Sequence, residues 1–172
     1  MPKYKKKITR QMDYDEFKSK IQDLPRSRQA FLSVLFFAGV RVSEALAVTP
    51  EDVWYDNTTV YIQFHRLKGS KQTDPTPLPR TDALTYLCGL TEDPFPWSRS
   101  TGYRIVRRTF PDEGEGLYPH FFRQNRIIKI GEEFGDPTVY SFVGICAQSI
   151  DHYRGKVDIK KVGKAMWKEV QS

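Results

Sequence analysis

An almost entirely apolar segment near the start of the chain most limits what the chain can fold into. Residues 28–38 (RQAFLSVLFFA) carry apolar side chains on nearly every side of a helix rather than along one stripe. A helix of this kind is stable in water only when other elements surround it. Gly39 follows, a residue type favoured where a helix ends. We therefore predict a central helix over residues 28–38, with the rest of the chain packed around it.

Helices are predicted for most of the remaining chain. Asp13 is suited to the N-cap of a first helix, Glu16 occupies its capping-box position, and Pro25 ends it. A last helix, over residues 158–170, has one narrow apolar stripe. The other predicted helices span residues 42–48, 81–90, 100–109, 119–134 and 137–146.

One short sheet is predicted between these helices. Residues 59–64 alternate, with Val60, Ile62 and Phe64 on one face, as expected of a half-buried strand. A polar connection rich in basic residues leads to a second short strand at 76–78, which makes a hairpin. The predicted fold class is therefore α+β, mainly α-helical, with one small antiparallel sheet.

Composition predicts a single soluble domain. The chain has 172 residues, of which 39% are hydrophobic, enough for a core without disulfides or metals. No stretch approaches the roughly 20 apolar residues of a membrane span, and the start is not a secretory signal. Cys88 and Cys146 are interpreted as reduced thiols without a zinc pattern, which favours the cytoplasm of a host cell.

Positive charge is concentrated at the N-terminus. Residues 1–12 hold five of the 27 basic residues and no acidic one, which leaves 22 basic against 21 acidic residues in the remainder. A basic tail of this kind can follow a phosphate backbone. Lys5, Lys6 and Lys7 are therefore predicted to bind DNA.

Five residues, in a fixed order, indicate chemistry at a phosphodiester. Arginines neutralise a phosphate that gains charge, a tyrosine attacks it, and a lysine and a histidine transfer protons. Two of the five are three positions apart on a predicted helix and so share a face. The five candidates are Arg41, Lys68, His120, Arg123 and Tyr153.

These segments resemble the tyrosine recombinases, the family of phage and archaeal integrases. Residues 38–46 (AGVRVSEAL) are similar to the motif around the family's first arginine. Residues 68–71 (KGSK) are similar to its hairpin lysine segment, and residues 120–123 (HFFR) to its His-x-x-Arg. Tyr153 follows thirty positions after that second arginine. The resemblance implies a catalytic domain over residues 13–172, with the family's N-terminal DNA-clamping domain absent.

The resemblance also implies roles for individual residues. Lys68 becomes the general acid for the leaving 5′ oxygen, although counting back from the second strand favours Lys71. Glu44 becomes the residue that orients Arg41. Arg126, one turn beyond the His-x-x-Arg segment, is assigned to DNA contact.

Residues 143–146 (VGIC) depart from the family pattern. The family has a histidine or tryptophan where this chain has Ile145, and isoleucine cannot donate a hydrogen bond to phosphate. His152, beside the predicted nucleophile, is a possible substitute.

The implied function is that of a site-specific DNA recombinase or integrase of a virus or mobile element. It would cut and rejoin double-stranded DNA through a 3′-phosphotyrosyl intermediate, without a metal, ATP or any other cofactor. Assembly on DNA as a dimer or tetramer is expected through the C-terminal helix, docked on a neighbouring subunit; the alternative is a helix folded back on its own domain. Two other functions stay open: a type IB topoisomerase-like enzyme, and a DNA-binding regulator of the same fold with impaired catalysis.

Overall fold

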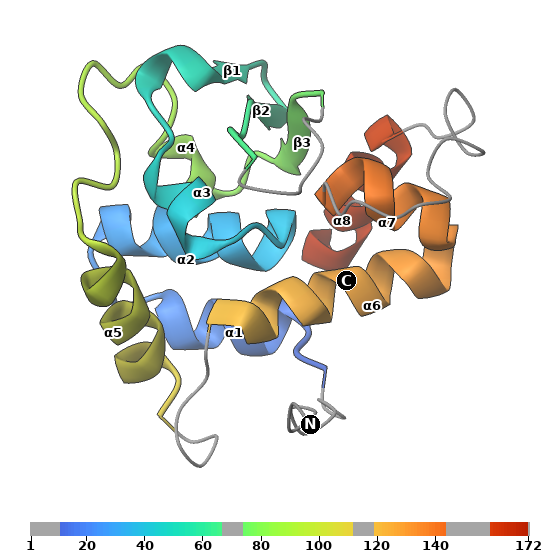
Figure 1. Cartoon of the computed structure of the whole chain (residues 1–172), viewed down its shortest axis with the longest axis horizontal. Helices are drawn as coiled ribbons and strands as arrows, with labels where there is room; N and C mark the ends of the chain where they lie inside the picture. The colour runs from blue at the N-terminus through green and yellow to red at the C-terminus, as the bar shows by residue number, and fades with distance from the viewer. Residues whose placement is uncertain (1–10, 67–73, 112–118, 144–158, 172) are drawn as a thin grey trace, which may run out of the picture.

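A computed structural model describes residues 11–66, 74–111, 119–143 and 159–171 of the chain. The predicted central helix is confirmed as α2 (Arg26–Ala38), whose residues from Ala30 to Ala38 are all buried. In Figure 1 it lies between the sheet on one side and α1 and α6 on the other. Gly39 ends α2 with a left-handed φ of 64°. A Cβ at this position would lie 2.9 Å from Cβ of Arg126, so both the φ angle and the close approach of α6 require glycine.

Aromatic contacts join α2 to the helices on that side. The helix α1 (Tyr14–Ile21) begins as predicted, because the Asp13 side chain accepts a hydrogen bond of 2.9 Å from the Glu16 backbone N–H. The Phe17 ring stacks on the Phe36 ring with centroids 4.2 Å apart. The Phe122 ring, from α6 (Pro119–Phe134), meets both rings edge-on. These rings form the middle of the core.

Shorter helices complete the framework. α7 (Asp136–Val143) packs on α6, and α5 (Arg99–Thr109) packs on α3 (Val42–Leu46). The helix predicted over residues 81–90 is wrong in length, because only α4 (Asp82–Thr85) is α-helical. Turns follow it to Gly89, whose φ of 76° no helix can contain.

The sheet has three antiparallel strands in the order β1-β2-β3. The predicted hairpin is confirmed as β2 (Thr59–Ile62) and β3 (Thr76–Pro79), with Val60 opposite Leu78. The first strand, β1 (Val53–Tyr55), follows a 3₁₀ turn (Pro50–Asp52) and was not predicted. It is only three residues long, and two of its residues are exposed, so it carries no alternating pattern.

The outer strand β3 has proline at both positions that face away from β2. The backbone N–H of Arg80 donates to the Thr58 carbonyl. In an antiparallel pair, every second residue directs its backbone N–H and C=O groups at the neighbouring strand, so the backbone groups of Pro77 and Pro79 point away from β2. Helix α8 (Ile159–Gln171) lies against this strand. A Cβ at Gly163 would lie 3.1 Å from Cβ of Pro77, so a glycine here permits the close approach.

Helix α8 packs on its own domain in this single chain, the arrangement considered above as the alternative; docking on a neighbouring subunit in an assembly on DNA stays a prediction. Val162 and Met166 are buried, and the Trp167 indole N–H donates to the Thr58 carbonyl at 2.9 Å. The narrow apolar stripe of α8 was judged too small for a core, but polar contacts with α6 add to it.

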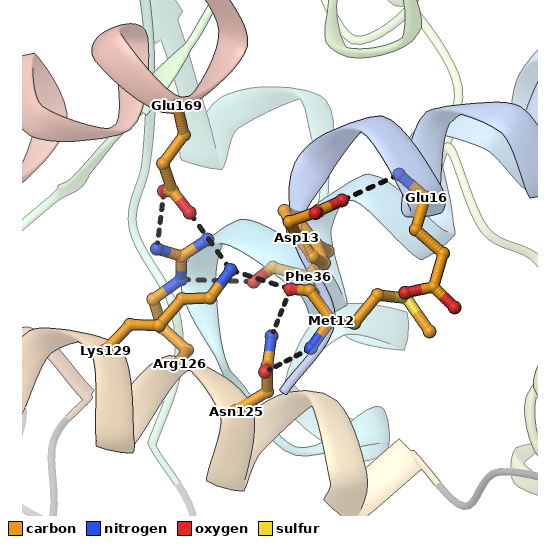
Figure 2. A network of polar contacts seen from close by, with 8 residues as sticks. All are labelled: Met12, Asp13, Glu16, Phe36, Asn125, Arg126, Lys129 and Glu169. Atoms are coloured by element: carbon orange, nitrogen blue, oxygen red, sulfur yellow. Dashed lines mark hydrogen bonds and ion pairs between the residues drawn. The ribbon is translucent and has the colours of Figure 1, made fainter. Parts of the chain in front are cut away.

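Those polar contacts centre on Glu169. Its carboxylate accepts hydrogen bonds from Arg126 (2.9 Å) and Lys129 (3.1 Å), both on α6 (Figure 2). Lys129 also donates to the Met12 carbonyl at 2.7 Å, and Asn125 bonds both the N–H and the carbonyl of Met12. One network therefore ties the start of the described chain and its last helix to α6.

Candidate functional site

Arg41 stands at the start of α3, two residues after the end of α2. Its backbone is extended (φ −70°, ψ 150°), and its N–H donates to Glu44 Oε1 at 2.9 Å. The side chain is 40% exposed, so the guanidinium reaches the surface. The predicted motif therefore does place an arginine at the edge of the core.

Glu44 is the centre of a cluster of guanidinium groups. Its side chain is completely buried, yet three arginines approach it: Arg41 Nη1 lies 3.9 Å from Oε2, while Nη1 of Arg66 and of Arg123 lie 3.8 and 4.0 Å from Oε1. These distances are too long for hydrogen bonds. One carboxylate thus faces three cations, so these four side chains together carry a net positive charge. We call these four residues the arginine cluster.

Arg123 enters the arginine cluster from α6. Its Nη1 donates to the Gly39 carbonyl at 2.9 Å, and its side chain is 5% exposed. Burial and the nearby Arg41 charge lower the pKa of Arg123, and Glu44 opposes them. Two arginines that are far apart in the sequence therefore meet at the end of α2, as the resemblance implied.

Arg66 is the member of the arginine cluster that sequence reasoning missed. It follows β2, and its Nη2 donates to the Phe142 carbonyl of α7 at 3.1 Å. Burial lowers the pKa of Arg66 to about 10; Glu44 opposes this shift, whereas Arg123 and Arg41 add to it. The alternation that placed Val60 and its partners on the buried face also places residue 66 there, so the signal was present.

His120 lies in the first turn of α6 and is exposed. The helix that it was predicted to share with Arg123 is confirmed. Its position at the N-terminal end of a helix favours an anion nearby, because the helix dipole is positive there.

The remaining site predictions lie outside the described residues and stay predictions. They concern the general acid, the nucleophile, the possible accessory groups, the departure from the family pattern and the basic tail. These residues are Lys68, Lys71, Tyr153, His152, Ile145, Lys5, Lys6 and Lys7.

Arg126 is not placed to bind DNA, which corrects its assignment. The side chain is 2% exposed, and its donors go to the Phe36 carbonyl and to Glu169. The guanidinium also lies over the ring of Phe36, with 5.3 Å to the centroid. Position on the helix suggested a basic stripe, but residue 126 is on the side of α6 that faces α2 and α8.

Three further observations concern the described ranges. No group of three or more histidine, cysteine, aspartate or glutamate residues there is arranged to hold a metal. No helix in these ranges is long and apolar enough to cross a bilayer. A cavity of about 370 Å³ between α6 and α8 is lined by Arg126, Lys129 and Met166 among others, and so does not coincide with the arginine cluster.

Comparison with solved structures identifies the fold. XerH, a site-specific recombinase bound to its difH substrate in a pre-cleavage complex, superposes with a TM-score of 0.61 over 90% of this chain at 18% identity. The XerA recombinase gives 0.57 over the whole chain at 17% identity. The chain has the fold of a tyrosine recombinase catalytic domain.

The integrase of the Tn1549 transposon, in complex with transposon right-end DNA, has the same fold at a TM-score of 0.51, over 95% of this chain at 13% identity. The chain spans 52% of XerH, 67% of XerA and 66% of this integrase. No family model and no curated protein matches the sequence. The recombinase fold is therefore visible in the structure although the sequences have diverged widely.

Proposed function

We propose that this chain is the catalytic domain of a site-specific DNA recombinase or integrase that works through a 3′-phosphotyrosyl intermediate. The observation that carries the proposal is the arginine cluster. In a recombinase fold, Arg41 and Arg123 converge on the buried Glu44 and leave an excess of positive charge. Such a site is suited to a phosphate that gains charge as a nucleophile attacks.

The proposed reaction has two balanced steps. The Tyr153 oxygen attacks the phosphorus, the bond from phosphorus to the 5′ oxygen breaks, and Lys68 or Lys71 gives that oxygen a proton. His120 accepts the tyrosine proton and can then hydrogen-bond the phosphate. A 5′ hydroxyl of another strand then attacks the phosphotyrosine and gives its proton to the deprotonated lysine, while the released tyrosine takes its proton back from His120. Because the intermediate keeps the bond energy, the exchange needs no ATP.

The surface beside the arginine cluster supports a DNA partner. Helix α5 has no acidic residue, and its exposed arginines are Arg99, Arg104, Arg107 and Arg108. Gly102 seats α5 closely on α3, with an added Cβ 3.1 Å from Val42. Helix α5 therefore packs on α3, the short helix that Arg41 precedes. We propose that the exposed arginines of α5 contact DNA phosphates on either side of the phosphate that is cleaved.

A catalytically impaired DNA-binding regulator is the second candidate. The observation in its favour is Ile145, which replaces a donor that the resembling family directs at the phosphate. Such a protein would bind DNA through the same surface but would form no covalent intermediate.

Trapping of covalent DNA adducts tests the proposal without knowledge of the target site. The protein is incubated with a library of randomised duplexes, denatured with detergent, and the DNA that stays attached to protein is sequenced. We expect attachment through a 3′ end, recognised by resistance to a 3′-to-5′ exonuclease, and enrichment of one sequence. The genomic position of that sequence then tests the assignment to a virus or mobile element.

Tyr153→Phe is the matched control because it removes only the nucleophilic oxygen. It should bind the enriched duplex as the wild type does and form no adduct. Adducts at the wild-type level would show that another residue is the nucleophile. Tight, sequence-specific binding by the wild type without any adduct would favour the regulator.

A further inference from the structure

Arg66 is the most buried of the three arginines of the cluster. Its side chain is completely buried, whereas the side chains of Arg123 and Arg41 are 5% and 40% exposed. It donates to a backbone carbonyl of α7, and its guanidinium lies over the Phe64 ring at 5.2 Å to the centroid. Because the Arg66 side chain has no exposed surface, we expect its effect to be exerted through its neighbours rather than by direct contact with a ligand.

Arg66 faces the charged side chain of Glu44. The carboxylate is buried and faces Arg41 and Arg123 as well, so without a third cation it would draw both of them toward itself. With Arg66 at 3.8 Å, part of that attraction is taken up from the buried side. The net charge of the cluster becomes +2 rather than +1, counting three arginines and one glutamate as fully charged.

Arg66 also connects the cluster to the end of α7. The carbonyl that it binds belongs to Phe142, three positions before Ile145 in the sequence. Ile145 is where the chain lacks a donor that the resembling family has. The structure thus places a buried cation at the end of α7, close in the sequence to the position that lacks the family's hydrogen-bond donor.

We propose that Arg66 is a positioning residue of the phosphate site: it compensates Glu44 from the buried side, so that Arg41 and Arg123 stay available to an anion, and it fixes the end of α7 against the cluster. This inference rests on the proposed function for its ligand, a DNA phosphodiester. The lowered pKa of Arg66 is consistent with a cation that burial and two like charges destabilise and that Glu44 partly stabilises.

The first experiment measures adduct formation at saturating DNA for R66M and R66K. We expect R66M to be slower by about tenfold or more, the scale of a misplaced reacting group, with DNA affinity within about threefold of the wild type. Arg80→Met is the matched control, because Arg80 also donates to a backbone carbonyl (Asp56, 2.7 Å) but lies outside the cluster. It should cleave at the wild-type rate.

The pH dependence of R66K separates charge from packing. The introduced ammonium group would be buried against Glu44, Arg41, Arg123 and the Phe142 carbonyl, so it should lose its proton below the usual lysine pKa. The ratio of the R66K rate to the wild-type rate should therefore fall as the pH rises. A ratio that stays flat, or an R66M rate equal to that of the wild type, would overturn the proposal.

Inorganic sulfate provides a test that does not need catalysis. It mimics the phosphate charge, and binding to the folded state raises the melting temperature. At matched ionic strength, we compare the melting temperature in sulfate with that in chloride. The increase caused by sulfate should be at least halved in R66K at high pH, and should be the same in Arg80→Met as in the wild type. If the wild type forms no adduct but this loss is seen, the proposed function fails and the role of Arg66 stands. An equal increase of the melting temperature in the wild type, R66K and Arg80→Met would overturn the proposed role of Arg66.

Folding of the variants is checked by a thermal cycle. Because Glu44 also faces Arg41 and Arg123, E44Q should cost less stability in R66M than in the wild type, since two rather than three arginines then lose their carboxylate. Independent, additive effects of the two substitutions would contradict the pairing of Arg66 with Glu44. If R66M does not fold, the R66K measurements carry the test.

Discussion

Arg41 and Arg123 face the same carboxylate from different surroundings. The Arg41 side chain is 40% exposed, whereas the Arg123 side chain is buried and donates to the Gly39 carbonyl at the end of α2. The two residues are expected to act together on a phosphate. They should differ in what they contribute to the stability of the protein.

Arg41→Ala and Arg123→Ala should each slow adduct formation by about 10² or more, the scale of losing one oxyanion donor. Only Arg123→Ala should also lower the free energy of unfolding, by about 1–3 kcal/mol, because Gly39 loses a donor and Glu44 a cation. Single-turnover kinetics and urea unfolding measure the two effects. Equal losses of stability in both variants would contradict the assigned environments.

Motif spacing predicted part of this site and missed the rest for a physical reason. Arg41, Glu44 and Arg123 were found because a short local pattern surrounds each of them. Arg66 has no such pattern, and only its parity with β2 marked it as buried. The assignment of Arg126 to DNA contact was wrong because the sequence shows that a residue lies on a helix, but not which other elements cover that side of the helix.

At the scale of elements, α8 is held to the domain by both charge and shape. Burial pushes the pKa of Glu169 upward, but Arg126 and Lys129 outweigh it and hold that pKa below its usual 4.5. A carboxylate with a depressed pKa stabilises the folded state above the unfolded value, and this contribution is lost as the pH falls through the folded value.

Glu169→Gln should therefore lower the free energy of unfolding by about 1–3 kcal/mol at pH 7, since a buried charged partner is lost. The difference from the wild type should shrink as the pH falls below 4.5. Urea titrations between pH 3 and pH 7 measure this. Glu132→Gln, at an exposed position of α6, is the control and should match the wild type throughout. A penalty that does not change with pH would mean that the Glu169 charge does not matter.

Gly163→Leu should release α8 from the sheet, because even a Cβ at this position lies 3.1 Å from Pro77. Hydrogen exchange should show loss of protection in residues 159–171 while α2 stays protected. Lys164→Leu, at the neighbouring exposed position, adds the same side chain away from the strand and should keep α8 protected. Retained protection in Gly163→Leu would show that the approach of α8 to β3 is less close.

Capping signals and periodicity predicted most elements correctly. The starts of α1 and α6 and the end of α2 follow from local residues, and all three are confirmed. β1 and the short α4 were not predictable in this way, because their limits depend on pairing with β2 and on the Gly89 turn. The docking of α8 was also unpredictable, since it depends on charges from a distant helix.

For the whole molecule, the distribution of positive charge determines how DNA binding is divided. Five basic residues lie in residues 1–10, and α5, which packs on α3, exposes four arginines. Met12 is buried and bonded to Asn125, so a truncation that removed it would also damage the core. Deletion should therefore stop at residue 10.

Deletion of residues 1–10 should weaken DNA binding and reduce the slope of log affinity against log salt by up to about 4.5, since five basic residues are lost and about 0.9 counterion is released per contacted phosphate. The free energy of unfolding should change little. Fluorescence anisotropy between 50 and 200 mM salt (about a fourfold range) measures the slope. A second variant, in which Arg104, Arg107 and Arg108 are changed to alanine, should also reduce the slope of log affinity against log salt. An unchanged slope in the deletion would mean that the tail does not contact DNA.

The prolines of β3 protect the edge of the sheet from pairing with another chain when α8 is not packed against it. An uncovered outer strand normally offers N–H groups to which a strand of another chain can bind. Here both outward-facing positions, Pro77 and Pro79, have no N–H to offer. The protein can therefore expose this edge without inviting aggregation through strand addition, and release of its last helix carries little risk for solubility.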